Sequence, residues 1–156
     1  VNIPGHVVQV VQATLTAQSS TTSDSFVNLF SATITPTSNT SKILVRYHSG
    51  LSMRSAVYSG AMKLQRGSTD IFLGDALDVR TRATTMAWSD TYDYMVVPQV
   101  NEFLDSPATT SATTYNIVYR SGYTGNAVHV GRSFQAAHGV ANHTYPSSLT
   151  LMEIAQ

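Results

Sequence analysis

The feature that most constrains the fold is the segment 104–119, where a turn leads into a long stretch of alternating side chains. Asp105 and Ser106 can bond to their own backbone, and Pro107 fixes φ near about −65°. From residue 113 to residue 120, Thr, Tyr, Ile and Tyr alternate with Thr, Asn, Val and Arg. A period of two is that of a β-strand with one wetter face. The closing segment 149–154 alternates in the same way, so the chain is predicted to be all-β.

The same alternation predicts further strands, which are separated by turn residues. The predicted strands cover residues 7–16, 26–34, 42–49, 61–66, 70–73, 91–97, 113–120, 127–134 and 148–154. Residues 67–69 form the turn of a hairpin, residues 18–25 and 74–85 are polar connections, and Pro98 is expected to end its strand. No amphipathic helix and no internal repeat is found. We therefore predict one domain over residues 1–156, an antiparallel β-sandwich and most simply a jelly roll.

Composition excludes several classes of function. The formal net charge is +0, and charged residues make up 12% of the chain, about half the usual share. Neither value favours nucleic acid or an anionic membrane as a partner. There is no cysteine, and no apolar run is long enough to span a membrane. No cofactor is expected. The chain begins at Val1, which is consistent with a processed product or a part of a longer protein.

The order and spacing of several segments carry a family resemblance. These are residues 5–12, 33–45, 63–75, 104–119 and 148–155. Together they resemble the C-terminal β-domain of tail-fibre and fibre-like virion structural proteins of tailed phages, particularly phages of marine bacteria and cyanobacteria. The resemblance implies a protein of the virion without enzymatic activity. It also implies a homotrimer that contacts other virion proteins.

The segment 75–99 departs most from the pattern of that family. It is long and polar, and it carries side chains typical of interfaces and of sites where sugar rings stack. The candidates are Arg80, Arg82, Trp88 and Tyr92. Aromatic residues in a loop of this length argue for an ordered, functional loop. We predict that these four residues bind the partner, a glycan or a protein on the host surface.

Two clusters of acidic residues suggest other chemistry. Asp70, Asp75 and Asp78 lie close together in the sequence, and Asp90 and Asp93 follow. A pair of carboxylates across a cleft is the machinery of a glycosidase, and closely spaced aspartates can also bind Ca²⁺. The spacing fits no known calcium loop. Solvated aspartates in turns are the favoured interpretation.

Three histidines near the C-terminus are candidate metal ligands. His129, His138 and His143 have no known metal-binding spacing, although imidazoles bind Zn²⁺ and Ni²⁺. In a trimer, one histidine per chain facing the three-fold axis would form a site without any motif. His129, in a predicted strand, is the best candidate for this. A hydrogen-bonded or exposed histidine is the favoured interpretation, and no metal is predicted.

Three alternatives to a fibre domain for host attachment remain open. The first is a capsid decoration protein or another virion assembly protein, whose partner is a coat protein. The second is a carbohydrate-active enzyme that uses the aspartate clusters. The third is a non-viral lectin or adhesin of similar fold.

Overall fold

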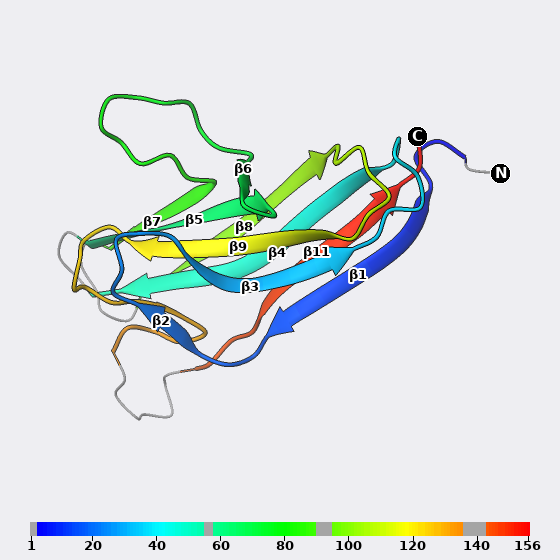
Figure 1. Ribbon diagram of the computed structural model, residues 1–156. Helices are drawn as coiled ribbons and strands as arrows, with labels where there is room; N and C mark the ends of the chain where they lie inside the picture. The colour runs from blue at the N-terminus through cyan, green and yellow to red at the C-terminus, as the bar shows by residue number, and fades with distance from the viewer. Residues whose placement is uncertain (1–2, 55–57, 90–94, 136–142) are drawn as a thin grey trace.

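The structure, a computed structural model, describes residues 3–54, 58–89, 95–135 and 143–156. These residues form strands, turns and loops, and they include no helix (Figure 1). The strands pair antiparallel and form two sheets that face each other. The predicted all-β sandwich is confirmed. No helix in this part of the chain could cross a membrane.

The larger sheet has six strands. They are β1 (Val7–Leu15), β2 (Ser19–Thr21), β4 (Lys42–Met53), β8 (Val96–Asp105), β10 (Val128–Val130) and β11 (Ser147–Ile154). The last strand, β11, pairs with β1 on one side and with β4 on the other, so its predicted inner position is confirmed. The other edge of β4 pairs with β8.

The smaller sheet has five strands. They are β3 (Val27–Ile34), β5 (Tyr58–Arg66), β6 (Thr69–Ile71), β7 (Thr85–Ser89) and β9 (Thr113–Ser121). Here β9 lies between β3 and β5, and β5 pairs with the short strand β6 at one end and with β7 at the other. The predicted hairpin of β5 and β6 is present.

The connectivity is that of a jelly roll. Without the three short strands β2, β6 and β10, the sheet orders are β1-β11-β4-β8 and β3-β9-β5-β7. Successive long strands cross from one sheet to the other, except between β5 and β7. Two Greek keys wound in this way define the jelly roll, so this part of the prediction is also confirmed.

The core lies between the sheets and follows the alternation of the strands. On β9, the predicted apolar face of Tyr115, Ile117 and Tyr119 is buried. The facing residues come mainly from β4 and β11. They include Ile43, Val45, Tyr47, Leu149 and Leu151.

The strand β8 differs from the prediction because Pro98 does not end it. The strand continues to Asp105, and among the described residues β8 pairs only with β4. Proline lacks an N–H donor and is tolerated on such an edge, where that donor would have no ladder partner. The expected strand over residues 91–97 therefore overlaps β8 only at its end, and residues 91–94 lie outside the described part.

Three further segments differ from the prediction. Residues 19–21 form β2, although serine and threonine there suggested a turn. Residues 127–134 contribute only the three residues of β10. Residues 85–89 form β7, an added strand on the edge of β5, where a long loop had been expected.

Candidate ligand-binding groove

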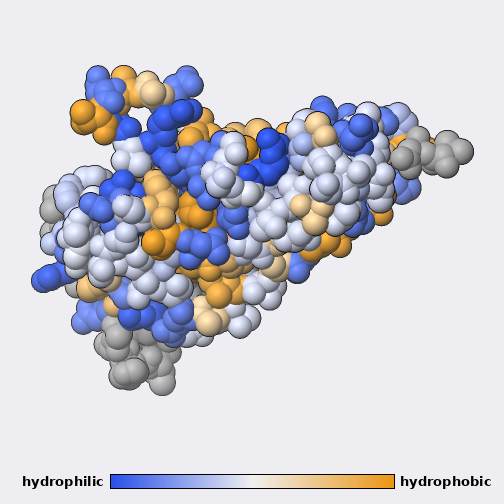
Figure 2. Space-filling model, viewed as in Figure 1, coloured by the Kyte–Doolittle hydropathy of each residue, from blue (hydrophilic) through white to orange (hydrophobic). Residues whose placement is uncertain are grey.

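A groove of about 690 Å³ lies between the outer face of the five-stranded sheet and the loop from β6 to β7. This loop covers residues 72–84, and Figure 1 shows it in green, projecting beside β5 and β7. In Figure 2 the loop stands clear of the body of the molecule and carries hydrophobic and hydrophilic residues side by side. The volume is within the range of ligand-binding clefts, about 300–1,000 Å³.

Small residues form the floor of the groove. Ser59 and Ala61 face outward on β5, because Gly60 and Met62 face the core. Gly122 follows β9, and its N–H donates a hydrogen bond of 2.7 Å to the carbonyl of Ser59. A Cβ on Gly122 would collide with the Ser59 hydroxyl, so this close approach needs glycine. Because these floor residues are small, they leave space in the groove that larger side chains would fill.

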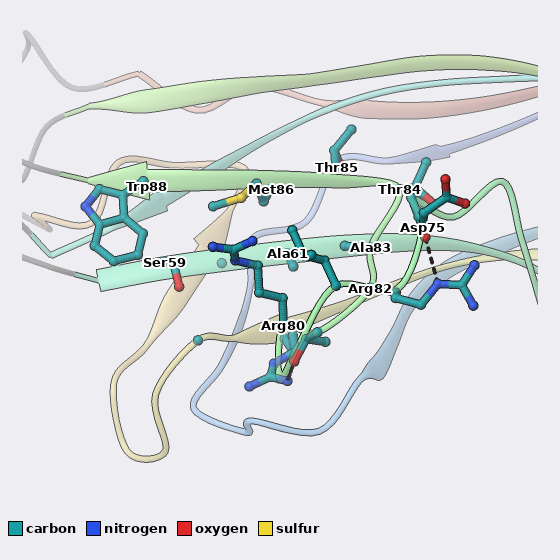
Figure 3. Close-up of a pocket in the computed structure, with 16 residues that line it drawn as sticks. Ser59, Ala61, Asp75, Arg80, Arg82, Ala83, Thr84, Thr85, Met86 and Trp88 are labelled. Carbon is teal, nitrogen blue, oxygen red and sulfur yellow. Dashed lines mark hydrogen bonds between the residues drawn. The ribbon is translucent and has the colours of Figure 1, made fainter.

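Two large side chains on β7 form one wall. Met86 and Trp88 face outward, while Ala87 between them is buried. Trp88 is opposite Ser59 in the sheet register, and Met86 is opposite Ala61. Figure 3 shows this arrangement, with the indole of Trp88 at one end of the groove. Trp88 is 48% exposed, so a face of its ring is available to a ligand.

The loop forms the opposite side of the groove and is tied to the sheet. Nε of Arg82 donates a hydrogen bond of 2.7 Å to the carbonyl of Gly74, drawn as a dashed line in Figure 3. Gly74 in turn donates its N–H to the carbonyl of Ala83 at 3.3 Å. Nearer the middle of the loop, Nη1 of Arg120 on β9 donates to the Thr81 hydroxyl at 3.1 Å. The first two bonds connect the two arms of the loop to each other, and the third ties the loop to β9.

The two ends of the loop are also anchored. Phe72 stacks on Phe103 of β8, with ring centroids 4.8 Å apart and planes 20° apart. At the other end, the N–H of Thr84 donates to the carbonyl of Met62, and its hydroxyl accepts from the N–H of Leu64, both at 2.9 Å. The described part of the predicted segment 75–99 thus begins with this anchored loop and continues into β7. The aromatic residues on which the prediction of order rested, Trp88 and Tyr92, lie outside the loop itself.

The side chains that line the groove carry an excess of positive charge. They include Arg80, Arg82 and Arg120, against one carboxylate, Asp75. Figure 3 shows Asp75 beside Arg82, at the opposite end from Trp88. Within the described residues, none of the three arginines takes part in an ion pair. Guanidinium groups near an exposed indole can bind an anionic ligand that also has a flat apolar face.

The structure brings together three of the four predicted binding residues. Arg80 and Arg82 lie on the loop and Trp88 lies on β7, so all three line the groove. The expectation that Trp88 lies in a loop is wrong, because β7 carries it at an outward strand position. Tyr92 lies outside the described residues. The role of all four in binding stays a prediction.

The groove residues that sequence reasoning missed include Met86 and Arg120. A signal for Arg120 was present, since it occupies an outward position at the end of the predicted strand 113–120. Its closeness to the loop depends on the pairing of β9 with β5, in which Arg120 is opposite Ala61. Met86 gave no such signal, because β7 itself was not predicted.

Two of the three histidine candidates, His129 and His143, lie in the described part of the chain. His129 is 7% exposed on β10, and its Nδ1 accepts a hydrogen bond of 3.1 Å from Arg132. Burial and the Arg132 charge lower the pKa of His129 to about 4. His143 is exposed, and His138 lies outside the described residues. No group of three possible ligands for a metal occurs in the described part of the chain.

The aspartate candidates have separate surroundings. Asp70 accepts a hydrogen bond of 2.7 Å from Nζ of Lys63 within the hairpin of β5 and β6. Asp75 lines the groove, and Asp78 is exposed in the loop with a φ of 50°. Asp90 and Asp93 lie outside the described residues. Asp75 is thus the single carboxylate among the described lining residues, whereas glycosidases use two.

Elsewhere, Glu153 is buried in a polar network at one end of the sandwich. It accepts a hydrogen bond of 2.6 Å from Nε2 of Gln9, and the N–H and the hydroxyl of Thr37 each donate to it at 2.8 Å. Burial alone would raise the pKa of Glu153, but these hydrogen bonds to the charged form hold it at about 2. The network stabilises an ionised carboxylate inside the protein.

A second buried carboxylate, Asp105, ends β8. Its oxygens accept from Nη1 of Arg66, both at 2.9 Å, and one also accepts from the Tyr115 hydroxyl at 2.6 Å. The side chain thus binds across the sandwich, where the sequence had suggested a bond to its own backbone. Burial, and then the nearby Asp105 carboxylate, raise the pKa of Tyr115 far above its ordinary value.

Comparisons with known proteins define no family. No protein-family profile matches the chain, and no curated protein matches it in sequence. In structure, the chain is similar to a chain from the structure of infectious bursal disease virus, Gx strain. The TM-score is 0.39 and the identity is 16%, over 96% of this chain and 37% of that one. The chain thus spans just over a third of that neighbour, and the similarity is too low to carry an argument about function.

Proposed function

We propose that this chain is a virion structural domain, the fibre domain of a tailed phage, which attaches the particle to a host surface. The observation that carries the proposal is the groove, in which the half-exposed Trp88 on β7 faces guanidinium groups of the loop and of β9 that form no ion pair among the described residues. Tryptophan and arginine are the residues most often responsible for binding energy at interfaces. Neither is needed at these positions for the core.

Two further observations support a structural, adhesive role. Jelly rolls occur in coat proteins and lectins, although a fold alone does not determine function. The segments quoted above resemble phage fibre domains over nearly the whole chain. We further propose that the domain is not an enzyme, since Asp75 has no second carboxylate beside it among the described lining residues.

We propose a homotrimer in which the outer face of the six-stranded sheet contacts a second copy. An apolar row crosses this face from β1 to β8, and its members are paired in the sheet register. They are Val10, Met152, Leu44 and Leu104. Val10 is 56% exposed and Leu104 is 45% exposed. The Arg46–Glu102 ion pair lies on the same face, beside this row. Aligned apolar side chains with polar groups at their border are typical of contacts between copies of a chain.

Light scattering of the purified chain at micromolar concentration tests the assembly. We expect the mass of a trimer, and we expect Leu104→Glu to shift it to that of a monomer while the β-sheet signal in circular dichroism is kept. A single monomeric species of the unmodified chain would contradict the assembly.

Binding of the labelled protein to a panel of bacterial cells, marine strains and cyanobacteria included, tests the attachment role. Trp88→Ala should weaken binding by about 1–3 kcal/mol, the range for removal of an interface anchor. Val79→Ala is the matched control, because Val79 lies on the loop opposite Trp88, is fully exposed and does not line the groove. Equal binding by Trp88→Ala and the unmodified protein would contradict the attachment role. Binding to purified coat protein alone would favour a decoration protein.

A further inference from the structure

The groove is asymmetric in a way that specifies the chemistry of its ligand. One wall presents the indole of Trp88 and the thioether of Met86, and the floor beneath them is made of Ser59 and Ala61. A flat ring can lie against the indole without meeting another large side chain on the floor. The hydroxyl of Ser59, opposite Trp88, is placed to hydrogen-bond a polar group on the edge of that ring. These features suit a sugar ring, which has apolar faces and a polar rim.

The part of the groove away from Asp75 carries positive charge that no carboxylate among its described lining residues neutralises. Asp75 lies beside Arg82 at the end away from Trp88 (Figure 3). Arg80 and Arg120 are left as the cations of the remaining groove. Arg120 uses Nε for the carbonyl of Ser121 and Nη1 for Thr81, so it is held in place by two bonds. No protein group among the described residues accepts a hydrogen bond from the side chain of Arg80.

We infer that the groove recognises a sugar that carries a carboxylate. The sugar ring stacks on Trp88, and its carboxylate is bound by the guanidinium of Arg80, with Arg120 adding positive charge. Arginine is suited to this because its planar donors match the two oxygens of a carboxylate. The chain as a whole has a formal net charge of +0, so the positive charge of the groove is local and selects among ligands. This inference rests on the attachment function proposed above and names the class of its ligand.

Titration calorimetry with matched acidic and neutral sugars tests the inference. The probes are trigalacturonic acid with its carboxyl-reduced form, and sialyllactose with lactose. We expect at least one acidic sugar to bind about tenfold or more tightly than its neutral counterpart, the effect of one charge-assisted bidentate contact. Raising the salt concentration should reduce this difference, because exposed charges are screened.

Three variants locate the effect. Arg80→Gln should remove the preference for the acidic sugar and leave binding of the neutral sugar unchanged, while Trp88→Ala should weaken both. Arg46→Gln removes the same charge from the outer face of the other sheet, where Arg46 pairs with Glu102, and should change neither. Equal binding of acidic and neutral sugars, or an unchanged preference in Arg80→Gln, would overturn the inference.

The cell-binding assay separates failure of this inference from failure of the attachment function. If neither acidic sugar binds but Trp88→Ala still weakens cell binding, the ligand class is wrong and the attachment function stands. If neither acidic sugar binds and Trp88→Ala leaves cell binding intact, both are wrong.

Discussion

Charged side chains have opposite surroundings in two regions of this molecule, the buried network around Glu153 and the exposed groove. Around Glu153, a buried carboxylate is surrounded by donors from Gln9 and Thr37, and it is not exposed at all. In the groove, Arg80 and Arg82 are exposed, and the described residues provide them with no carboxylate in an ion pair. The first arrangement stabilises the fold, because each polar atom has its partner within the chain. The second leaves binding capacity for another molecule.

Acid should affect the buried groups most strongly. Because the pKa of Glu153 in the folded chain, about 2, is below its ordinary value of 4.5, its contribution to stability is present above pH 4.5 and is lost as the pH falls toward 2. The pKa of His129 is also lower in the folded chain, about 4 against an ordinary 6.5, so acid destabilises the fold here too. Its contribution to stability is present above pH 6.5 and is lost as the pH falls toward 4. Together the two shifts correspond to on the order of 7 kcal/mol, comparable with the whole stability of a small domain.

Denaturant unfolding at stepwise pH from 7 to 3 measures this loss. The variant Glu153→Gln should lack the part of the decline below pH 4.5 and keep the part between pH 6.5 and 4. A free energy of unfolding that stays constant over the whole range would contradict the proposed role of both networks.

Removal of the buried carboxylate itself should have the next largest effect. We expect Glu153→Ala to lower the free energy of unfolding by about 3 kcal/mol, because it leaves the donors of Gln9 and Thr37 unpaired and opens a cavity. Glu102→Ala is the matched control, since Glu102 is exposed in a surface pair with Arg46 and should contribute less than about 1 kcal/mol. Similar losses in the two variants would show that burial is not the cause.

A smaller effect is expected where only one hydrogen bond is removed. Tyr115→Phe keeps the ring in the core but takes its hydroxyl from Asp105, which still accepts from Arg66. The loss of stability should be about 1–2 kcal/mol in thermal or denaturant unfolding. Tyr123→Phe, at an exposed ring, should change stability by less than about 0.5 kcal/mol. No loss in Tyr115→Phe would mean that the hydroxyl is dispensable.

The smallest effect on stability is expected in the groove. Trp88→Ala should change the free energy of unfolding by less than about 0.5 kcal/mol, because the indole is half exposed and outside the core. A loss as large as that of Glu153→Ala would remove the contrast between the two regions. The groove wall would then be part of what stabilises the fold.

Much of the fold could be predicted because alternation is a local signal. The buried face of β9 and the inner position of β11 follow directly from side chains spaced by two. Two errors have physical reasons. Pro98 breaks most strands but is tolerated on the edge formed by β8, and the polar strand β2 is held by its pairing with β10 rather than by its own composition. Neither property is visible along the chain.

The groove was predicted only in part, because the pairing of β5 with β7 and with β9 brings together residues that are far apart in the sequence. Arg80, Arg82 and Trp88 stood out as interface residues in one polar segment. The floor could not be foreseen, since Ser59 and Gly122 are brought together by the pairing of β5 with β9. Small residues give no signal in a sequence, and their importance comes from the space that they leave open.

The anchoring of the loop from β6 to β7 affects which sequence changes the fold can tolerate during evolution. Both of its flanking strands pair with β5, and none of residues 72–84 belongs to the hydrophobic core. New side chains between the Phe72 and Thr84 anchors would therefore meet solvent or ligand rather than the interior. Under the proposed attachment function, changes in the loop would alter what the groove binds while the sandwich beneath stays the same. The loop would then be the segment to exchange in order to redirect binding to a different ligand.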